Sequence, residues 1–271
     1  YLIMAISKHD NMSFLEHLEE LRWHVIRSLI AIISAGFVCF LMKDFIFDTI
    51  IFGPKKMDFP TYKFLCQAAT FIGVETNFCG DEFPFVVQNR TMAGQFSAHV
   101  MTSVISGFII SFPYVLYEFW KFISPGLLEK EKAKSRGFIF ISSILFFVGV
   151  LFGYYVISPL SINFLGTYQV STQVLNEIDL GSFISLVRSS ALASGIIFEL
   201  PIIIYFLTKA GVVTPESLVK YRKYALVLVL ILAAIITPPD VASQIIVAIP
   251  IVVLYQVSIF ISRIVVKNQN K

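Results

Sequence analysis

Six runs of apolar residues, each bounded by charged or turn-forming residues, dominate the pattern along the chain. A helix needs about 20 mostly apolar residues to cross the hydrocarbon core of a bilayer, which is about 30 Å thick. The runs cover residues 25–42, 98–120, 138–157, 183–207, 224–236 and 241–261. The first four are long enough to cross, so each predicts one transmembrane helix.

The last two runs predict shorter spans. Residues 224–236 reach only about 20 Å at a rise of about 1.5 Å per residue before the chain meets a Thr-Pro-Pro-Asp turn. Residues 241–261 are interrupted by Pro250, which removes a backbone hydrogen bond from a helix. We expect this pair to tilt differently from the other spans, or to lie where the bilayer is thinner.

The composition supports a membrane protein and argues against most other classes. The chain of 271 residues is 56% hydrophobic, 15% aromatic and only 14% charged, and its mean hydropathy is +0.78. Soluble globular chains are about 25% charged. A soluble enzyme, a disordered chain and a disulfide-dense secreted domain are therefore nearly excluded, and a net charge of +3 is too small to indicate nucleic-acid binding. The predicted fold class is all-α, with six transmembrane helices in a single integral membrane domain over residues 1–271.

Basic residues in the short loops predict the orientation. Residues 121–136 and 209–223 are rich in Lys and Arg, whereas residues 158–182 and 237–240 contain neither. By the positive-inside rule both termini lie in the cytoplasm. Residues 44–96 then form a large outer loop, and residues 13–24 form a cytoplasmic amphipathic helix that begins with a capping box. The stretch before the first span is polar, and no small-residue cleavage site follows that span, so we expect the span to be retained as an anchor.

A few residues are candidates for structure or chemistry. Cys66 and Cys79 share the predicted outer loop, where an oxidising environment would favour a disulfide, whereas Cys39 lies in the first span. Gly149 and Gly153 form a GxxxG pattern that favours close helix packing. Glu199 lies near the middle of the fourth span, where an ionised carboxylate costs at least about 2.5 kcal/mol. It either contacts a transported substrate or partner helix, or it is a neutral group with an internal hydrogen bond.

Carboxylates also gather on the predicted cytoplasmic side. Glu16, Glu19 and Glu20 precede the first span, and Glu129 and Glu131 lie in the next inner loop. Such carboxylates can pair with the guanidinium groups of a ligand, although composition alone favours a solvated Glu/Lys surface. The spacing of the histidines and glutamates is a weak metal signal, and the spans contain no protease-like arrangement. We therefore expect no metal, no other cofactor and no enzymatic activity.

Four separated motifs resemble the TatC family, the multispanning receptor subunit of the twin-arginine (Sec-independent) protein translocase. They are FLEHLEELR at 14–22, FP at 112–113 continuing into YEFWKFISPGL at 117–127, FELP at 198–201 and TPPDVASQ at 237–244. The motifs occur in the family order and on the expected spans, which makes the resemblance specific. It implies a concave six-helix receptor that binds Arg-Arg signal peptides of folded cargo.

The resemblance also implies roles for individual residues. It assigns the twin arginines to Glu20 and Glu131, within a site shaped by Arg22, Pro125 and Leu127. It places Glu199 inside the membrane, facing the concavity, with a role in signal-peptide insertion or partner contact. It assigns Asp240 and Gln244 to an edge that binds partner proteins. Because an arginine fork suits carboxylates better than a lysine ammonium does, a Lys-Lys ligand should bind less well.

The implied partners are TatA- and TatB-type single-span proteins, membrane lipid and further copies of the chain, in a complex driven by the proton-motive force in a bacterial cytoplasmic membrane. The chain departs from the family in its enlarged outer loop and in Glu118, where many relatives carry Gln. Two alternatives stay open. One is a proton- or ion-coupled transporter of small solutes that uses Glu199, and the other is a purely structural scaffold.

Overall fold

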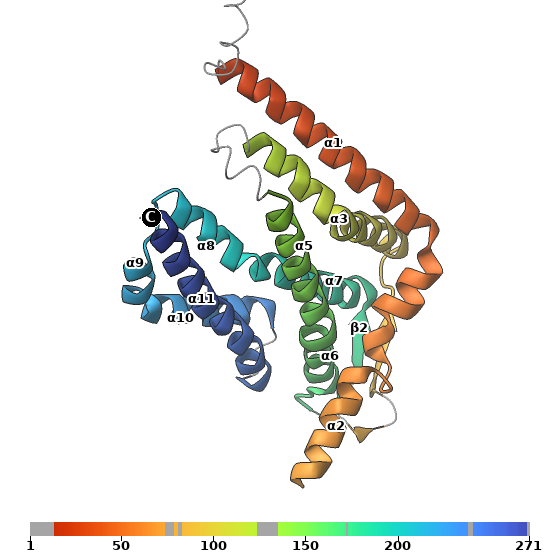
Figure 1. The fold of residues 1–271 in the computed structure, drawn as a ribbon. Coiled ribbons are helices and arrows are strands. Elements are labelled where there is room, and N and C mark those ends of the chain that lie inside the picture. The colour runs from red at the N-terminus through yellow and green to blue at the C-terminus, as the bar shows by residue number, and fades with distance from the viewer. Residues whose placement is uncertain are drawn as a thin grey trace, which may run out of the picture.

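The computed structural model describes residues 14–73, 79–80, 83–123, 135–171, 173–237 and 241–269, and this part of the chain is mainly helical. Figure 1 shows long helices that cross one another, with a small cap at one end. Five helical segments are long and apolar enough to span a membrane: Leu18–Leu41, Gly94–Ile123, Gly137–Thr167, Leu180–Lys209 and Ser243–Asn268. The predicted class of helical membrane protein is confirmed, whereas the count of six spans and the orientation stay predictions.

Helices α1 (Phe14–Leu41) and α3 (Gly94–Ile123) pack along each other more extensively than any other pair in the described structure. Gly36 and Gly107 are both buried at their contact, and a Cβ added at Gly107 would come within 2.6 Å of the Gly36 Cα. The two backbones therefore touch. We call the end where α1 begins and α3 ends the proximal end, and the opposite end the distal end (Figure 1).

The third apolar run forms one long helical rod. It consists of α5 (Ser135–Phe152), the π-helical η5 (Gly153–Ile157) and α6 (Ser158–Thr167), so the rod passes its predicted end at residue 157. Gly149 and Gly153 both face α7 so closely that an added Cβ would meet its backbone. The predicted close packing at the GxxxG pattern is confirmed.

The fourth run is broken in the middle. Helix α7 (Leu180–Phe198) ends at Glu199, and α8 (Leu200–Lys209) begins directly after it. Pro201 lies in the first turn of α8, where its missing N–H leaves no intrahelical hydrogen bond unmade. The fourth run is thus broken next to Pro201, whereas α3 continues through Pro113.

The C-terminal part contains α9 (Pro215–Lys220), α10 (Arg222–Ile236) and α11 (Val241–Gln269). Helix α10 has 15 residues and is short, as predicted. Helix α11 has 29 residues and continues through Pro250, so the expectation of a second short span is not met. It packs on α8, where the Thr208 hydroxyl donates to Ser262 Oγ over 2.9 Å in a buried site.

The cap at the distal end consists of η1 (Phe45–Ile51), η2 (Gly53–Lys55), α2 (Pro60–Ile72) and two short strands. Strand β1 (Phe85–Gln88) pairs in parallel with β2 (Asn176–Asp179), with Phe85 opposite Asn176. The strands were not predicted from the sequence. They tie the segment before α3 to the start of α7.

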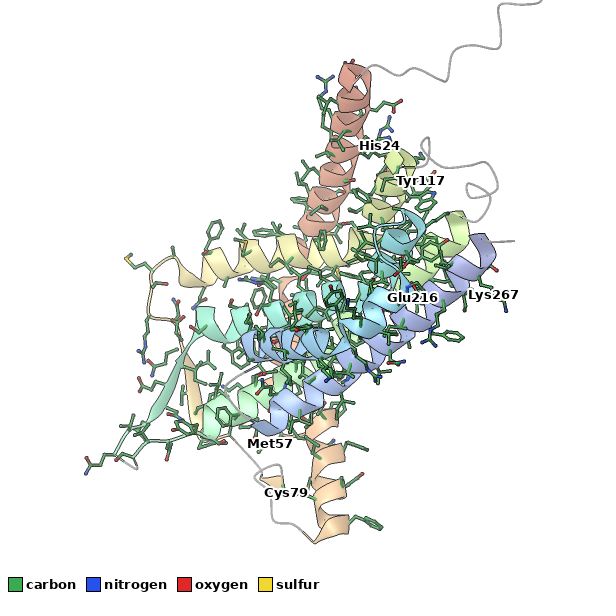
Figure 2. All side chains as sticks on the ribbon, turned by 90° about the vertical axis from the view of Figure 1, so that its left-hand side faces the viewer. His24, Met57, Cys79, Tyr117, Glu216 and Lys267 are labelled. Carbon is green, nitrogen blue, oxygen red and sulfur yellow. A yellow bond between two sulfur atoms is a disulfide. The ribbon has the colours of Figure 1, made fainter. Side chains whose placement is uncertain are left out.

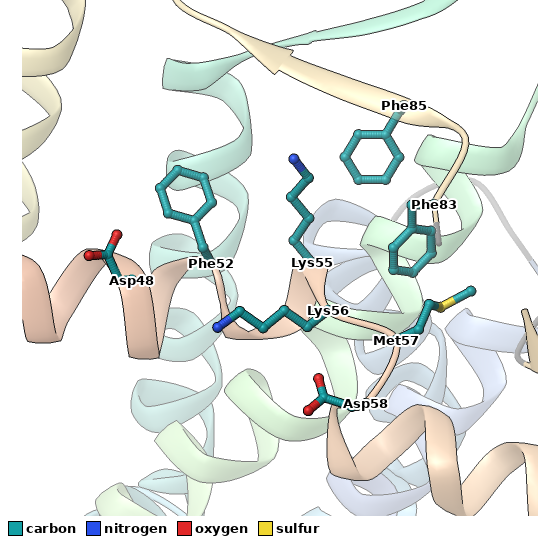
Figure 3. Close-up of a pocket in the computed structure, with 8 residues that line it drawn as sticks. All are labelled: Asp48, Phe52, Lys55, Lys56, Met57, Asp58, Phe83 and Phe85. Atoms are coloured by element: carbon teal, nitrogen blue, oxygen red, sulfur yellow. The ribbon is translucent and has the colours of Figure 1, made fainter. Parts of the chain in front are cut away.

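Side chains hold the cap together. Cys66 and Cys79 form a disulfide with Cα atoms 5.2 Å apart. The Tyr62 hydroxyl donates to the carbonyls of Pro54 at 2.8 Å and Pro159 at 3.0 Å, and its burial raises the pKa of Tyr62 above the usual value. Figure 3 shows the pocket beside η2, where the side chains of the adjacent Lys55 and Lys56 diverge.

Candidate functional site

Glu20 lies exposed near the proximal start of α1. It lines a groove of about 380 Å³ with Trp23, His24 and Arg27. No hydrogen bond or ion pair joins the Glu20 carboxylate to any residue that the structure describes. Arg22, expected beside it, instead pairs with Glu19 at 3.2 Å, and both of these side chains are exposed.

The other predicted members of this site, Glu131, Pro125 and Leu127, lie outside the described residues. Their approach to Glu20 therefore stays a prediction. The helices that precede and follow their segment, α3 and α5, reach the same proximal end as the start of α1 (Figure 1).

Glu118 forms a buried charge cluster that the sequence analysis did not predict. Its side chain is only 3% exposed, and its Oε2 lies 2.7 Å from His24 Nδ1 and 3.8 Å from Arg27 Nη1. Its Oε1 lies 4.0 Å from Lys121 Nζ. Figure 2 places His24 close to Tyr117 of α3, at the end opposite Cys79. A buried carboxylate needs such partners because the loss of its hydration is otherwise uncompensated.

The cluster affects Glu20 through the spacing of α1. His24 is four residues after Glu20, and side chains at this spacing are neighbours on a helix surface. His24 and Arg27 instead contact Glu118, and neither forms an ion pair with Glu20. Within the described part of the chain, the Glu20 carboxylate therefore has no cationic partner. A sequence signal for Glu118 existed, since it is an acidic residue within the apolar run 98–120 and three residues before Lys121.

Glu199 forms a second, separate polar site at the break between α7 and α8. Its Oε2 accepts a hydrogen bond from the Ser142 hydroxyl of α5 over 2.5 Å. Its Oε1 is buried and has no hydrogen-bond partner in the described part of the chain. The residue lines an apolar cavity of about 340 Å³ with Phe112, Trp120 and Phe206. One oxygen therefore has the internal hydrogen bond, and the other is free to accept a proton or a donor.

Gln244, a predicted partner-binding residue, lies at the start of α11. Its Nε2 donates to the Leu230 carbonyl of α10 over 3.1 Å, so it joins the two C-terminal helices. Asp240, assigned to the same edge, lies outside the described residues.

The sequence and the fold were compared with those of known proteins. The profile of the family described as Sec-independent protein translocase protein (TatC) matches residues 16–250. The chain is 45% identical to the Sec-independent protein translocase protein TatC of Blattabacterium sp. subsp. Periplaneta americana, over 97% of this chain and 99% of that protein. It is 34% identical to the TatC protein of Aquifex aeolicus, over 96% and 98% of the two chains.

Two solved structures have the same fold. Both are crystal structures of the twin-arginine translocase receptor TatC, and one of them was determined in DDM. The structure in DDM is 34% identical, with a TM-score of 0.69 over 90% of this chain and 98% of that chain. The other is 32% identical, with a TM-score of 0.65 over 93% of this chain and all of that chain. The helical architecture, the matched family profile and these relatives together establish that the chain belongs to the TatC family of Sec-independent protein translocase proteins.

Proposed function

We propose that this chain is the signal-peptide receptor of a Sec-independent translocase in a bacterial cytoplasmic membrane, with its proximal end in the cytoplasm. The twin arginines of a signal peptide on folded cargo bind Glu20 and Glu131, within a site that includes Arg22, Pro125 and Leu127. The chain acts as a receptor and not as an enzyme.

The observation that carries the proposal is that the Glu20 carboxylate pairs with no described residue, while the neighbouring side chains of His24 and Arg27 contact Glu118. An exposed carboxylate that was already paired with Arg27 would gain little from a further cation. With the side chains of His24 and Arg27 in contact with Glu118, Glu20 can accept the planar, two-pronged hydrogen bonds of a guanidinium group. A second carboxylate at Glu131 would match the second arginine.

The same proposal extends to assembly. TatA- and TatB-type single-span proteins bind the edge formed by α10 and α11, with Asp240 and Gln244 as polar contacts, and copies of the chain associate in a larger complex driven by the proton-motive force. The length of α10 supports the assignment of this edge to partner binding. Its 15 residues are too few to cross the full thickness of a bilayer, so a partner helix can occupy the membrane space that α10 leaves open. Glu199 takes part in signal-peptide insertion or partner contact.

The transporter alternative has less support. Its proposed relay, Glu199, shares its cavity mainly with apolar side chains, and Ser142 is the one polar neighbour among the described lining residues. Transporters usually gather several polar groups near the midplane of the membrane.

Peptide affinity tests the proposal. The purified full chain in nanodiscs is titrated with an Arg-Arg signal peptide and with its Lys-Lys version, using wild type, Glu20→Gln, Glu131→Gln and the double variant. Glu216→Gln, an exposed carboxylate on α9, is the matched control. We expect a preference for Arg-Arg of about tenfold, about 1.4 kcal/mol. Each single variant should weaken binding, and the double variant should abolish it.

Equal binding of both peptides, unchanged in the double variant, would contradict the proposal. If the Glu216→Gln control weakened binding as much as the Glu20 and Glu131 variants do, the loss of any carboxylate would have this effect. That result would also contradict the assigned site.

A further inference from the structure

A large cavity in the distal half of the molecule has no part in the proposed receptor function. It has a volume of about 770 Å³ and lies between η1, α3, the α5–η5 rod and α7. Apolar side chains form most of its wall, among them Ile105, Ile109, Ile110, Val150 and Leu151. We call this cavity the Arg188 groove, after the one arginine among its described lining residues.

Arg188 is half-buried in α7 and makes no hydrogen bond or ion pair with any described residue. It lies eight residues after the start of α7 at Leu180, about 12 Å along the helix. Its long side chain can carry the guanidinium toward the distal membrane boundary while the stem stays on apolar surface. A charge at this depth is expensive unless an anion or water accompanies it.

A second polar group in the groove also lacks a partner. Thr102, on α3, is 2% exposed, and its Oγ1 has no hydrogen-bond partner within the described structure. Thr102 lies eight residues after Gly94, so it is about as deep along α3 as Arg188 is along α7. Lys56 and Asp58 also line the groove. Their opposite charges roughly cancel, which leaves Arg188 as the net positive charge.

We propose that the Arg188 groove binds one membrane phospholipid, with the lipid phosphate on the Arg188 guanidinium and one acyl chain along the apolar wall. A phosphate diester offers two oxygens to the guanidinium fork. The groove has polar groups at its mouth and apolar groups deeper inside. A phospholipid has the same order, with a polar headgroup followed by apolar chains.

The rim of the groove favours a lipid over a peptide. Met42, Phe45 and Leu151 line the groove and are 50%, 53% and 53% exposed, so the groove is continuous with the surface that faces the acyl chains. An apolar peptide segment could cover this wall, but it would bring no anion to Arg188. The inference goes beyond the proposed receptor function and does not depend on Glu20 or Glu131.

Native mass spectrometry of the full chain in detergent tests the proposal with three probes: phosphatidylglycerol, diacylglycerol with the same chains, and glycerol phosphate. The variants are Arg188→Gln, Arg188→Lys and Ile110→Trp, which fills the apolar wall. Arg263→Gln, an exposed arginine near the end of α11, is the matched control. Thermal unfolding of each variant checks that it is folded.

We expect one tightly retained phosphatidylglycerol in wild type and in the Arg263→Gln control. Its affinity should fall at least tenfold in Arg188→Gln and in Ile110→Trp and stay within about threefold in Arg188→Lys. Diacylglycerol should bind at least tenfold more weakly, because it lacks the phosphate, and so should glycerol phosphate, because it lacks the chain. Equal retention of phosphatidylglycerol by Arg188→Gln, or equal binding of diacylglycerol, would overturn the proposal. Glycerol phosphate that binds as tightly as the lipid would reassign the site to a free anion and overturn it as well.

Discussion

Among single residues, Glu118 has the most consequential environment. Its carboxylate is buried between α1 and α3, within 4.0 Å of nitrogen atoms of His24, Arg27 and Lys121. Removing one member of a buried charged network leaves the others imperfectly solvated. The cost is moderated here because Arg27 is 52% exposed and can be hydrated.

Glu118→Gln should therefore destabilise the protein by about 1–2 kcal/mol. It should also weaken Arg-Arg peptide binding roughly 3- to 10-fold, because His24 and Arg27 become free to approach Glu20. Thermal unfolding in detergent and peptide titration measure the two effects. The control is Glu177→Gln, which breaks the exposed pair with Arg90 and should cost less than about 1 kcal/mol. If both variants behave alike, the buried cluster has no special role.

At the residue scale, sequence patterns predicted which carboxylates to consider but not how they pair. Glu20 and Glu199 stand out because each is a carboxylate in an informative position, one beside a membrane surface and one within an apolar run. The contact of Glu118 with His24 joins residues 94 positions apart. Such a contact depends on how α1 and α3 cross, and the periodicity of one helix does not contain that information.

At the scale of elements, small residues set the closest helix contacts. A Cβ at Gly107 would lie 2.5 Å from the Gly36 nitrogen and 2.6 Å from the Ile32 carbonyl oxygen. These are backbone atoms, so the clash cannot be relieved by rotating a side chain. In membranes, where helix association depends on close van der Waals packing, this contact should be sensitive to added volume.

Gly107→Ala should accordingly lower the stability by about 1–3 kcal/mol, the range for overpacked cores. The measurement is the unfolding midpoint in detergent, monitored by circular dichroism. Gly137→Ala on α5 is the matched control, because no atom lies within 4 Å of its added Cβ. It should leave the midpoint unchanged or raise it slightly, since alanine favours a helix over glycine. A midpoint for Gly107→Ala equal to that of the control would mean that the two helices can separate without cost.

The helices were more predictable than their ends and the cap. Runs of apolar residues predicted the four long spans and the short α10, because burial in lipid imposes a long apolar run. The length of α11 was missed because Pro250 was expected to interrupt the run, whereas the helix continues through it. The strands were missed because FVVQ and NEID are four residues each and carry no shared alternating pattern.

At the scale of the whole molecule, the two candidate carboxylates lie in separate environments. Glu20 is exposed at the proximal end, whereas Glu199 lies at a helix break and contacts Ser142. The contacts described for Glu199 include no residue of α1. Recognition and later steps of transport should therefore be separable by mutation.

Glu199→Gln should keep Arg-Arg peptide affinity within about twofold of wild type. The glutamine can still accept the Ser142 hydrogen bond, so we expect normal folding. Export of a folded reporter in cells should fall at least tenfold if the free carboxylate oxygen is used during insertion. Glu20→Gln is the comparison, since it should reduce both peptide binding and export. Normal export by Glu199→Gln would remove this residue from the mechanism.

The parallel pairing of β1 with β2 has a consequence for how the protein is made. The partner of Phe85 is Asn176, 91 residues later in the chain. Synthesis at about 5–20 residues per second separates the two by about 5–20 s. During this interval β1 is an unpaired edge, while the loop closed by Cys66 and Cys79 is already complete in sequence. The disulfide can therefore form early, whereas the two strands can pair only after residues 176–179 have been synthesised.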